Sequence, residues 1–196
     1  MLGFPAFANP GPVLVGKAVT LRLPRPRDFN EWARLRGESR AFLEPWEPRW
    51  ARDELEHAAW RERLRRYRAD FARGTGLSFF IFENASGRLA GGITAGNIRH
   101  GAAQSANIGY WMGERFAGKG LMAEALDLVI DHCFDTLRLH RLEAACIPDN
   151  GRSVRVLEKA GFSREGLLHS YLKINGIWQD HFLYALVADR RARKQG

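Results

Sequence analysis

Residues 113–126, GERFAGKGLMAEAL, combine a glycine-rich turn with the start of an apolar helix. The stretch nearly matches a P-loop, because Gly113 is followed after four residues by Gly118 and Lys119. A P-loop then needs Ser or Thr, whose hydroxyl binds magnesium, whereas this chain has Gly120. A strand, a turn and a helix in this order would present free backbone N–H groups at the positive end of the helix dipole. The stretch therefore predicts an anion site suited to a diphosphate held without a metal, although such a turn can also need glycine only for its geometry.

The segments around this turn alternate between strand and helix patterns. The helix that follows it carries an apolar stripe at i, i+3, i+4 and i+7 that includes Cys133, so we expect this cysteine in the core. Residues 84–87, NASG, and the pair Asn175-Gly176 indicate hairpin turns. Residues 42–50, FLEPWEPRW, are a predicted loop, because neither of their prolines suits a helix interior. Strands are predicted at residues 17–24, 77–83, 88–100, 105–112, 141–147, 162–172 and 177–187, and helices at residues 27–40, 52–73, 121–134 and 149–162.

The composition limits the number of domains and the kind of partner. A chain of 196 residues with 45% hydrophobic residues fits one α/β domain with a mixed sheet. We expect a flexible arm at residues 1–16, the domain at residues 17–188 and a basic tail at residues 189–196. Two cysteines and no apolar run of membrane length predict a cytoplasmic protein without a membrane partner. The net charge of +8 favours an anionic partner: nucleic acid, a ribosome or a phosphate-rich cofactor.

Three longer stretches, at residues 107–134, 140–162 and 171–186, together resemble the GCN5-related N-acetyltransferases, the GNAT family. The family's pyrophosphate motif, Q/R-x-x-G-x-G/A, is matched by Arg115, Gly118 and Gly120. The chain is most similar to the ribosomal-protein-alanine N-acetyltransferases of the RimJ and RimL kind. The resemblance covers about residues 17–188 and implies the GNAT fold, a mixed, mostly antiparallel sheet flanked by helices. The motifs of that branch stand at residues 45–48 (PWEP), 118–122 (GKGLM), 150–153 (N-x-x-S), 158–162 (EKAGF) and 176–181 (G-x-W-x-D-H).

The resemblance implies acetyl-CoA as the cosubstrate, bound without a metal. In the family, the strand before the glycine turn separates from its neighbour, and the pantetheine arm lies in the gap. Backbone groups of Tyr110, Trp111 and Met112 would bind that arm, and the Met112 N–H would polarise the thioester carbonyl. Asn150 would bind the pantetheine amide and Ser153 would lie beside the sulfur, although both residues also suit the start of a helix. The backbone around the diphosphate would come from Arg115, Phe116, Ala117, Gly118, Lys119, Gly120 and Leu121.

The proton acceptor is the less determined part of the chemistry. An α-amine has a pKa of about 8, so at pH 7 most of it is protonated and cannot attack. Many relatives carry a Glu in the strand A-E-I-G-Y, where this chain has Asn107, which cannot accept a proton. A Glu in a loop beside two tryptophans would be desolvated, so we predict Glu47 as the acceptor, and Tyr171 as the donor to the sulfur. The candidates that remain open are Glu44, Glu47, His100, His169 and Tyr171.

A double-displacement route through Cys146 is disfavoured. No His or Asp stands near Cys146 in the sequence, and it alternates within an apolar strand. Direct attack of the amine in a ternary complex is sufficient, because a thiolate, whose conjugate pKa is about 8.5, leaves readily.

The predicted function is transfer of an acetyl group to the N-terminal α-amino group of a protein, such as a ribosomal protein. The alternative acceptor is a small amine: a polyamine, an amino acid or an antibiotic. Two alternatives of other classes are a P-loop-like nucleotide-binding protein and a nucleic-acid-binding module. That module would be built on Arg61, Arg63, Arg65, Arg66 and Arg68. We expect at most weak, non-specific nucleic-acid binding, and either a monomer or a homodimer. One wall of the acceptor groove would be formed by Glu44, Trp46, Glu47 and Trp50.

Overall fold

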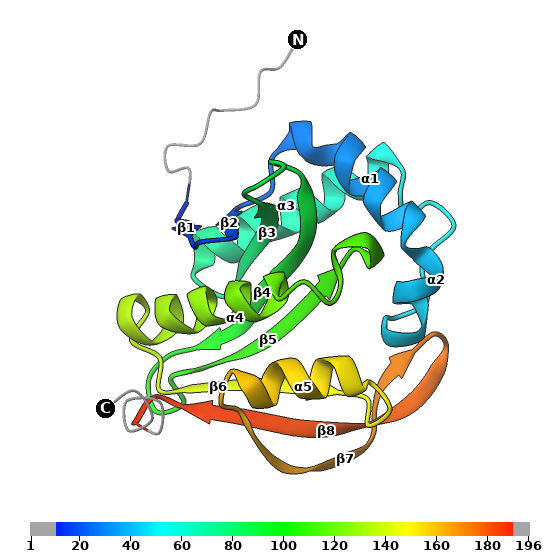
Figure 1. Ribbon diagram of the computed structural model, residues 1–196. Helices are drawn as coiled ribbons and strands as arrows, with labels where there is room; N and C mark the ends of the chain where they lie inside the picture. Colours follow the sequence, from blue (N-terminus) through cyan, green and yellow to red (C-terminus); the bar gives the residue numbers. More distant parts are fainter. Residues whose placement is uncertain (1–10, 190–196) are drawn as a thin grey trace.

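A computed structural model of the chain describes residues 11–189, which form one eight-stranded sheet with helices on both faces (Figure 1). The strand order is β1-β2-β3-β4-β5-β6-β8-β7, and every pair is antiparallel except β5 with β6. This confirms the predicted mixed, mostly antiparallel α/β domain. The strands are β1 (Val13–Val15), β2 (Val19–Arg22), β3 (Leu77–Glu83), β4 (Leu89–Arg99), β5 (Ser105–Met112), β6 (Arg141–Cys146), β7 (Ser163–Ile174) and β8 (Ile177–Val187).

The four main helices lie within the segments predicted as helical. The main helices are α1 (Phe29–Glu38), α3 (His57–Arg73), α4 (Leu121–Asp131) and α5 (Gly151–Lys159), with a short α2 (Arg40–Leu43). In Figure 1, α4 and α5 lie in front of the sheet and α3 lies behind it. Residues 132–136 continue α4 as one turn of π-helix.

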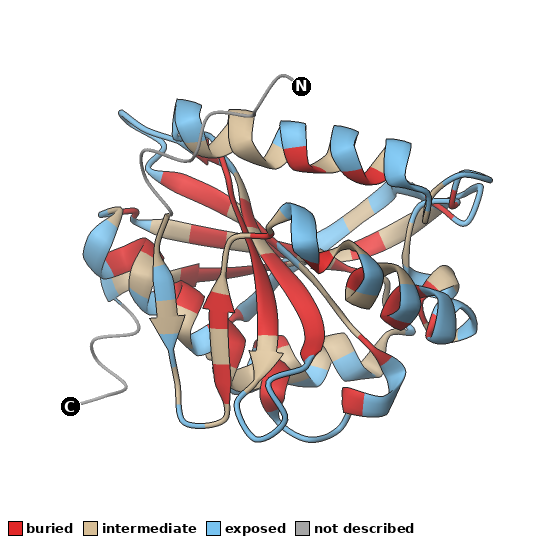
Figure 2. Ribbon diagram, turned by 90° about the horizontal axis from the view of Figure 1, so that it is seen from above, coloured by how far each residue is buried: buried red, intermediate tan, exposed pale blue. Residues whose placement is uncertain are grey.

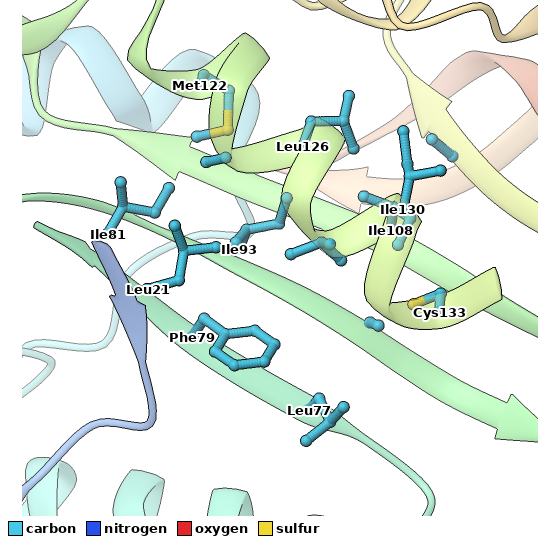
Figure 3. Close-up of a cluster of buried hydrophobic side chains, with 14 of the residues drawn as sticks. Leu21, Leu77, Phe79, Ile81, Ile93, Ile108, Met122, Leu126, Ile130 and Cys133 are labelled. Carbon is cyan, nitrogen blue, oxygen red and sulfur yellow. The ribbon is translucent and has the colours of Figure 1, made fainter. Parts of the chain in front are cut away.

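The core between α4 and the sheet follows from two periodicities. Leu77, Phe79 and Ile81 alternate along β3, so all three side chains point to the same face, where they meet the stripe on α4 (Figure 3). Leu126 and Cys133 are fully buried in that stripe, which confirms the predicted core position of the cysteine. Buried residues concentrate on the central strands, between the layers of helices (Figure 2). This core holds the strands that carry the site.

The predicted hairpin turn at Asn175-Gly176 is confirmed. Both residues have positive φ angles, 45° and 85°, as a two-residue turn between right-twisted strands requires. The turn joins β7 and β8, the pair at one edge of the sheet.

Strands β5 and β6 separate after a short stretch of pairing. Their parallel register contains only Ser105 with Arg141, Ala106 with Leu142, and Asn107 with Glu143. Beyond Asn107, β5 continues to Met112 paired with β4 alone. The second half of β5 therefore borders a gap on its other side.

Three local boundaries differ from the sequence predictions. Val13–Val15, expected within the flexible arm, pair with β2 as β1. The loop expected at residues 42–50 begins with the end of α2 and a 3₁₀ turn, Glu44–Trp46, because a proline fits the first turn of a helix. The helix expected from residue 52 begins at His57. The first ten residues of the expected arm and nearly all of the expected tail lie outside the described residues.

Within residues 11–189, no helix is both long enough and apolar enough to cross a membrane.

Candidate active site

The backbone of Met112 faces the gap between β5 and β6. The neighbouring Gly113 N–H donates to the carbonyl of Ala90 on β4 at 2.8 Å. Successive N–H groups of a strand point to opposite sides, so the Met112 N–H points away from β4 and into the gap. The same alternation directs the backbone of Tyr110 into the gap. The structure thus aims the backbone donor predicted for Met112 at the place where the strands separate.

The glycine turn connects β5 with α4. Gly118 and Gly120 have φ angles of 78° and 80°, in the left-handed region that favours glycine. Gly120 is the N-cap of α4, and no side chain caps the helix. The first N–H groups of α4 are therefore available to an anion, and the predicted strand–turn–helix geometry is present.

A built Cβ at Gly118 or Gly120 meets no atom within 4 Å. Within the protein, the need for glycine at these two positions therefore comes from the backbone conformation and not from crowding.

The two cations of the turn rest on Phe116, whose ring is buried. The Arg115 guanidinium lies 4.9 Å and the Lys119 ammonium 5.3 Å from the ring centroid. Arg115 also pairs with Glu38 at 3.2 Å, and Lys119 lies 4.0 Å from Glu83. Both cations are partly exposed beside the turn.

Asn150 and Ser153 begin α5, and the capping alternative for this pair is present. The Asn150 side-chain oxygen accepts a hydrogen bond from the Ser153 N–H at 3.1 Å. The Ser153 hydroxyl remains free of the cap and lies 2.8 Å from the hydroxyl of Tyr110. The two side chains thus meet across the gap that the Met112 N–H faces.

Burial controls the ionisation of the groups beside Ser153. Burial raises the pKa of Tyr110 far above its usual value, although the hydrogen bond with Ser153 opposes this. Burial also raises the pKa of the Cys146 thiol, although a hydrogen bond with the Ser153 side chain lowers it in part. Both groups are therefore protonated at neutral pH, and an unactivated thiol is a poor nucleophile. The family resemblance gives Tyr110 only a backbone role. Its hydroxyl contact could not be predicted, because the partner lies 43 residues away in the sequence.

The proline- and tryptophan-rich loop is held by Arg36, a buried residue of α1 that the sequence did not single out. Arg36 donates to both carboxylate oxygens of Glu47, at 2.9 and 2.6 Å. The Trp50 indole N–H donates to the same carboxylate at 2.8 Å. The Arg36 guanidinium also lies 4.3 Å from the centroid of Trp50 and 5.1 Å from that of Trp111. Arg36 therefore connects the loop to β5, beside the gap.

A cavity of about 560 Å³ lies between this loop and the sheet. Glu47 and Trp50 line one side of it, and residues 109–111 of β5 line another. A cavity of this size suits part of a peptide or a small molecule. Two residues predicted for the acceptor wall, Glu47 and Trp50, therefore share one cavity with the strand that borders the gap.

Glu44 and Trp46, also predicted for the wall of the acceptor groove, do not line this cavity. Glu44 pairs with Arg40 at 2.7 Å, and Trp46 is 37% exposed.

Tyr171 lies on β7, where its ring meets that of His181 at 5.7 Å between centroids. It lines a second cavity, of about 640 Å³, together with Asn107 and Glu143. The ring contact of Tyr171 is with His181, whereas the hydroxyl contact of Ser153 is with Tyr110. Among the other candidates for the proton acceptor, His169 lies 3.1 Å from the carboxylate of Asp180.

The described residues contain no group of three or more His, Cys, Asp or Glu side chains that could hold a metal ion.

Comparisons with known proteins agree with this geometry. Residues 18–163 match the model of a family described as an acetyltransferase (GNAT) domain. A probable N-acetyltransferase of Bacillus subtilis, YjcK, is 38% identical over 175 residues, which cover 89% of this chain and 97% of the relative. The ribosomal protein uS5-alanine N-acetyltransferase of Escherichia coli is 35% identical over 170 residues, which cover 86% of this chain and 87% of the relative. The solved structure of RimJ from Mycobacterium smegmatis, in complex with CoA-disulfide, is similar with a TM-score of 0.84 and 40% identity, covering 92% of this chain and 87% of that one.

Proposed function

Because this chain belongs to the GNAT acetyltransferase family and is an acetyl-CoA-dependent N-acetyltransferase, we propose that its acceptor is the N-terminal α-amino group of a protein, with a ribosomal protein as the favoured substrate. The similarity to an enzyme named for alanine N-acetylation of a ribosomal protein supports this acceptor. Family membership also overturns the P-loop alternative, since the glycine turn belongs to the acetyltransferase domain.

The observation that carries the proposal is the position of the cavity. Residues 109–111 line the cavity on one side of the sheet and border the gap between β5 and β6. An acceptor in the cavity would therefore approach the place where the Met112 N–H points. This arrangement supports direct attack in a ternary complex, in which both substrates are bound at once.

The residues around the gap fit acetyl-CoA, which supplies an activated acetyl thioester when bound. We assign the diphosphate to the backbone of residues 115–121 and the pantetheine arm to the backbone of Tyr110 and Met112 and to Asn150. The backbone of Trp111, also predicted for the arm, is turned toward β4 by the same alternation. The Met112 N–H would donate to the oxygen that becomes negative during attack. The Ser153 hydroxyl, supported by that of Tyr110, would donate a proton to the leaving thiolate. Tyr171, predicted for this step, stays the alternative donor.

The chemistry of the amine favours an α-amino acceptor over a polyamine. Removing the proton of an α-amine at pH 7 costs about 1.4 kcal/mol, because its pKa is about 8. Removing the proton of an alkyl amine with a pKa of about 10.4 costs roughly 4.6 kcal/mol. An enzyme that lacks the Glu found in many relatives at the position of Asn107 therefore works more readily on the α-amine.

Glu47 stays our candidate for the proton acceptor, with Glu44 as the next. The substitution Glu47→Gln tests it through the pH dependence of kcat/KM. If Glu47 accepts the proton, the acid limb of the profile disappears. Because both oxygens of Glu47 already accept hydrogen bonds, a retained acid limb with a raised KM would instead give it a positioning role. Glu44→Gln serves as the matched variant in the same loop.

A direct assay separates the acceptor classes. Release of CoA thiol would be measured with N-terminal Ala and Ser peptides, spermidine and a panel of aminoglycosides, and the site of acetylation located by mass spectrometry. We expect turnover of the peptides at the α-amine. Turnover of a small amine with inert peptides would overturn the N-terminal acceptor and leave the acetyl-CoA chemistry intact.

The cytoplasmic location, the weak nucleic-acid binding and the choice between monomer and homodimer stay predictions.

A further inference from the structure

The cavity between the loop and the sheet is lined by more cations than anions. Four arginines line it against two glutamates: Arg36, Arg49, Arg63 and Arg66 against Glu47 and Glu54. Both glutamates are already engaged by arginines, Glu47 by Arg36 and Glu54 by Arg63. The anions of the cavity are therefore neutralised within the protein.

The remaining two arginines, Arg49 and Arg66, form no ion pair with any residue in the described part of the chain. They come from different elements: Arg49 from the loop, directly before Trp50, and Arg66 from α3. Both are exposed, so their charges reach the solvent at the border of the cavity. Two guanidinium groups without an ion pair that line one cavity offer charge and hydrogen-bond donors to a carboxylate.

We propose that these two arginines select acceptor peptides with an acidic side chain shortly after the N-terminal residue. The inference rests on the proposed function and names the substrate class for the same site. The peptide's α-amine would point toward residues 109–111, and a Glu or Asp of the following residues would bind Arg49 and Arg66. A side chain a few residues further along is within reach, since an extended chain advances about 3.3–3.6 Å per residue.

The same positive charge acts against polycationic acceptors. A polyamine or an aminoglycoside entering this cavity meets like charges without a free carboxylate to compensate them. Nearby positive charge also favours the neutral form of an amine, which is the form that attacks. The electrostatics of the cavity thus disfavour the small-amine alternative and favour an acidic peptide.

A peptide series tests the inference. Peptides that begin with Ala would carry a single Glu, Gln or Lys, moved one position at a time from residue 2 to residue 6. We expect one position at which Glu lowers KM about tenfold relative to Gln, which corresponds to about 1.4 kcal/mol. Lys at that position raises KM. The advantage of Glu shrinks at 0.5 M salt, because the arginines are exposed and screened.

Two variants connect the preference to the arginines. In the double variant Arg49→Gln/Arg66→Gln, the ratio of kcat/KM for the Glu and Gln peptides falls toward one. Arg61→Gln is the matched control, because Arg61 is an exposed arginine of α3 that does not line the cavity. It leaves the ratio unchanged.

The outcomes separate this inference from the proposed function. Equal turnover of the Glu, Gln and Lys peptides overturns the inference alone. A preference for Glu that persists in the double variant also overturns it, because the carboxylate then binds elsewhere. Inert peptides together with turnover of spermidine overturn the proposed function and the inference with it.

Discussion

The hydroxyl of Tyr110 on β5 lies 2.8 Å from the hydroxyl of Ser153 on α5, across the gap between β5 and β6. Tyr110 is held protonated by burial, so it can donate to Ser153 and leave the Ser153 proton directed elsewhere. The contact joins the strand that carries the Met112 N–H to the helix capped by Asn150. Under the proposed function, this pair of protonated hydroxyls would donate a proton to the leaving thiolate.

Ser153→Ala should lower kcat by about tenfold to a hundredfold. This is at or below the lower limit of the usual effect of a proton donor, about a hundredfold to ten-thousandfold, because a thiolate leaves without much help. Tyr110→Phe should have a smaller effect, since it removes only the supporting hydroxyl. Steady-state kinetics with an Ala peptide measures both.

Ser153→Ala should keep the N-cap of α5, because the cap is made by the Ser153 backbone N–H and not by its hydroxyl. Its free energy of unfolding should fall by about 1 kcal/mol through the lost contact with the Tyr110 hydroxyl. Asn150→Ala removes that cap and should lower the free energy of unfolding by about 1 kcal/mol in urea. An unchanged kcat in Ser153→Ala would transfer the donor role to Tyr171.

Gly118→Val and Gly120→Val should each weaken CoA binding about tenfold or more. Both positions have positive φ, where an L-residue costs about 1–2 kcal/mol and a β-branched residue more, so the turn would leave its present shape. Isothermal calorimetry with CoA measures the change. Gly166→Ala is the control, because that glycine has no positive φ and a built Cβ there meets nothing within 4 Å. Equal affinity of all three variants would contradict a role of the left-handed turn in binding.

Arg36→Met should lower the free energy of unfolding by about 2–4 kcal/mol, because it leaves the Glu47 carboxylate largely buried without its cation. The same variant should raise KM for the peptide, since the loop would lose its attachment beside Trp111. Urea unfolding and steady-state kinetics measure the two effects. Arg40→Met, which breaks the exposed pair with Glu44, should change stability by less than about 1 kcal/mol. Equal losses in the two variants would show that the Arg36 contact is no stronger than a surface pair.

Alkaline pH should destabilise the fold partly through Cys133. Burial raises the pKa of its thiol to about 12, so above the ordinary thiol value the unfolded chain releases a proton that the folded chain keeps. The contribution of the Cys133 thiol to the free energy of unfolding is therefore fully present below a pH of about 9. Between about pH 9 and pH 12 it falls by about 1.4 kcal/mol per pH unit. Urea unfolding of the reduced protein at two alkaline pH values measures the slope. In Cys133→Val the free energy of unfolding should fall less steeply with pH. If the two proteins lost stability equally with rising pH, Cys133 would make no contribution.

Much of the fold could be predicted because its signals are local. The stripe on α4, the alternation along β3 and the turn at Asn175-Gly176 each depend on residues within a few positions of one another. The start of α3 and the short β1 could not be placed, because residues 52–56 continue the polar pattern of the helix and β1 depends on its pairing with β2.

The candidate site likewise contains local features that the sequence predicted and long-range contacts that it did not. The glycine turn and the Asn150 cap follow from motifs of neighbouring residues, and the structure shows both. The backbone role of Met112 was implied by the family resemblance, and the structure turns its N–H into the gap between β5 and β6. The contribution of Arg36 could not be predicted, because an arginine in an amphipathic helix has the same local pattern whether it is solvated or buried under a loop.

The sequence by itself determined most strands, the main helices and the glycine-rich turn, since backbone conformation and the apolar pattern are properties of neighbouring residues. The tertiary structure alone decided which side chains meet. It joined Tyr110 to Ser153 across 43 residues, and it brought Arg49 and Arg66 to one cavity from two separate elements. The physical reason is that these contacts depend on the order of the strands and on the point where β5 leaves β6, which are set by the packing of the whole sheet.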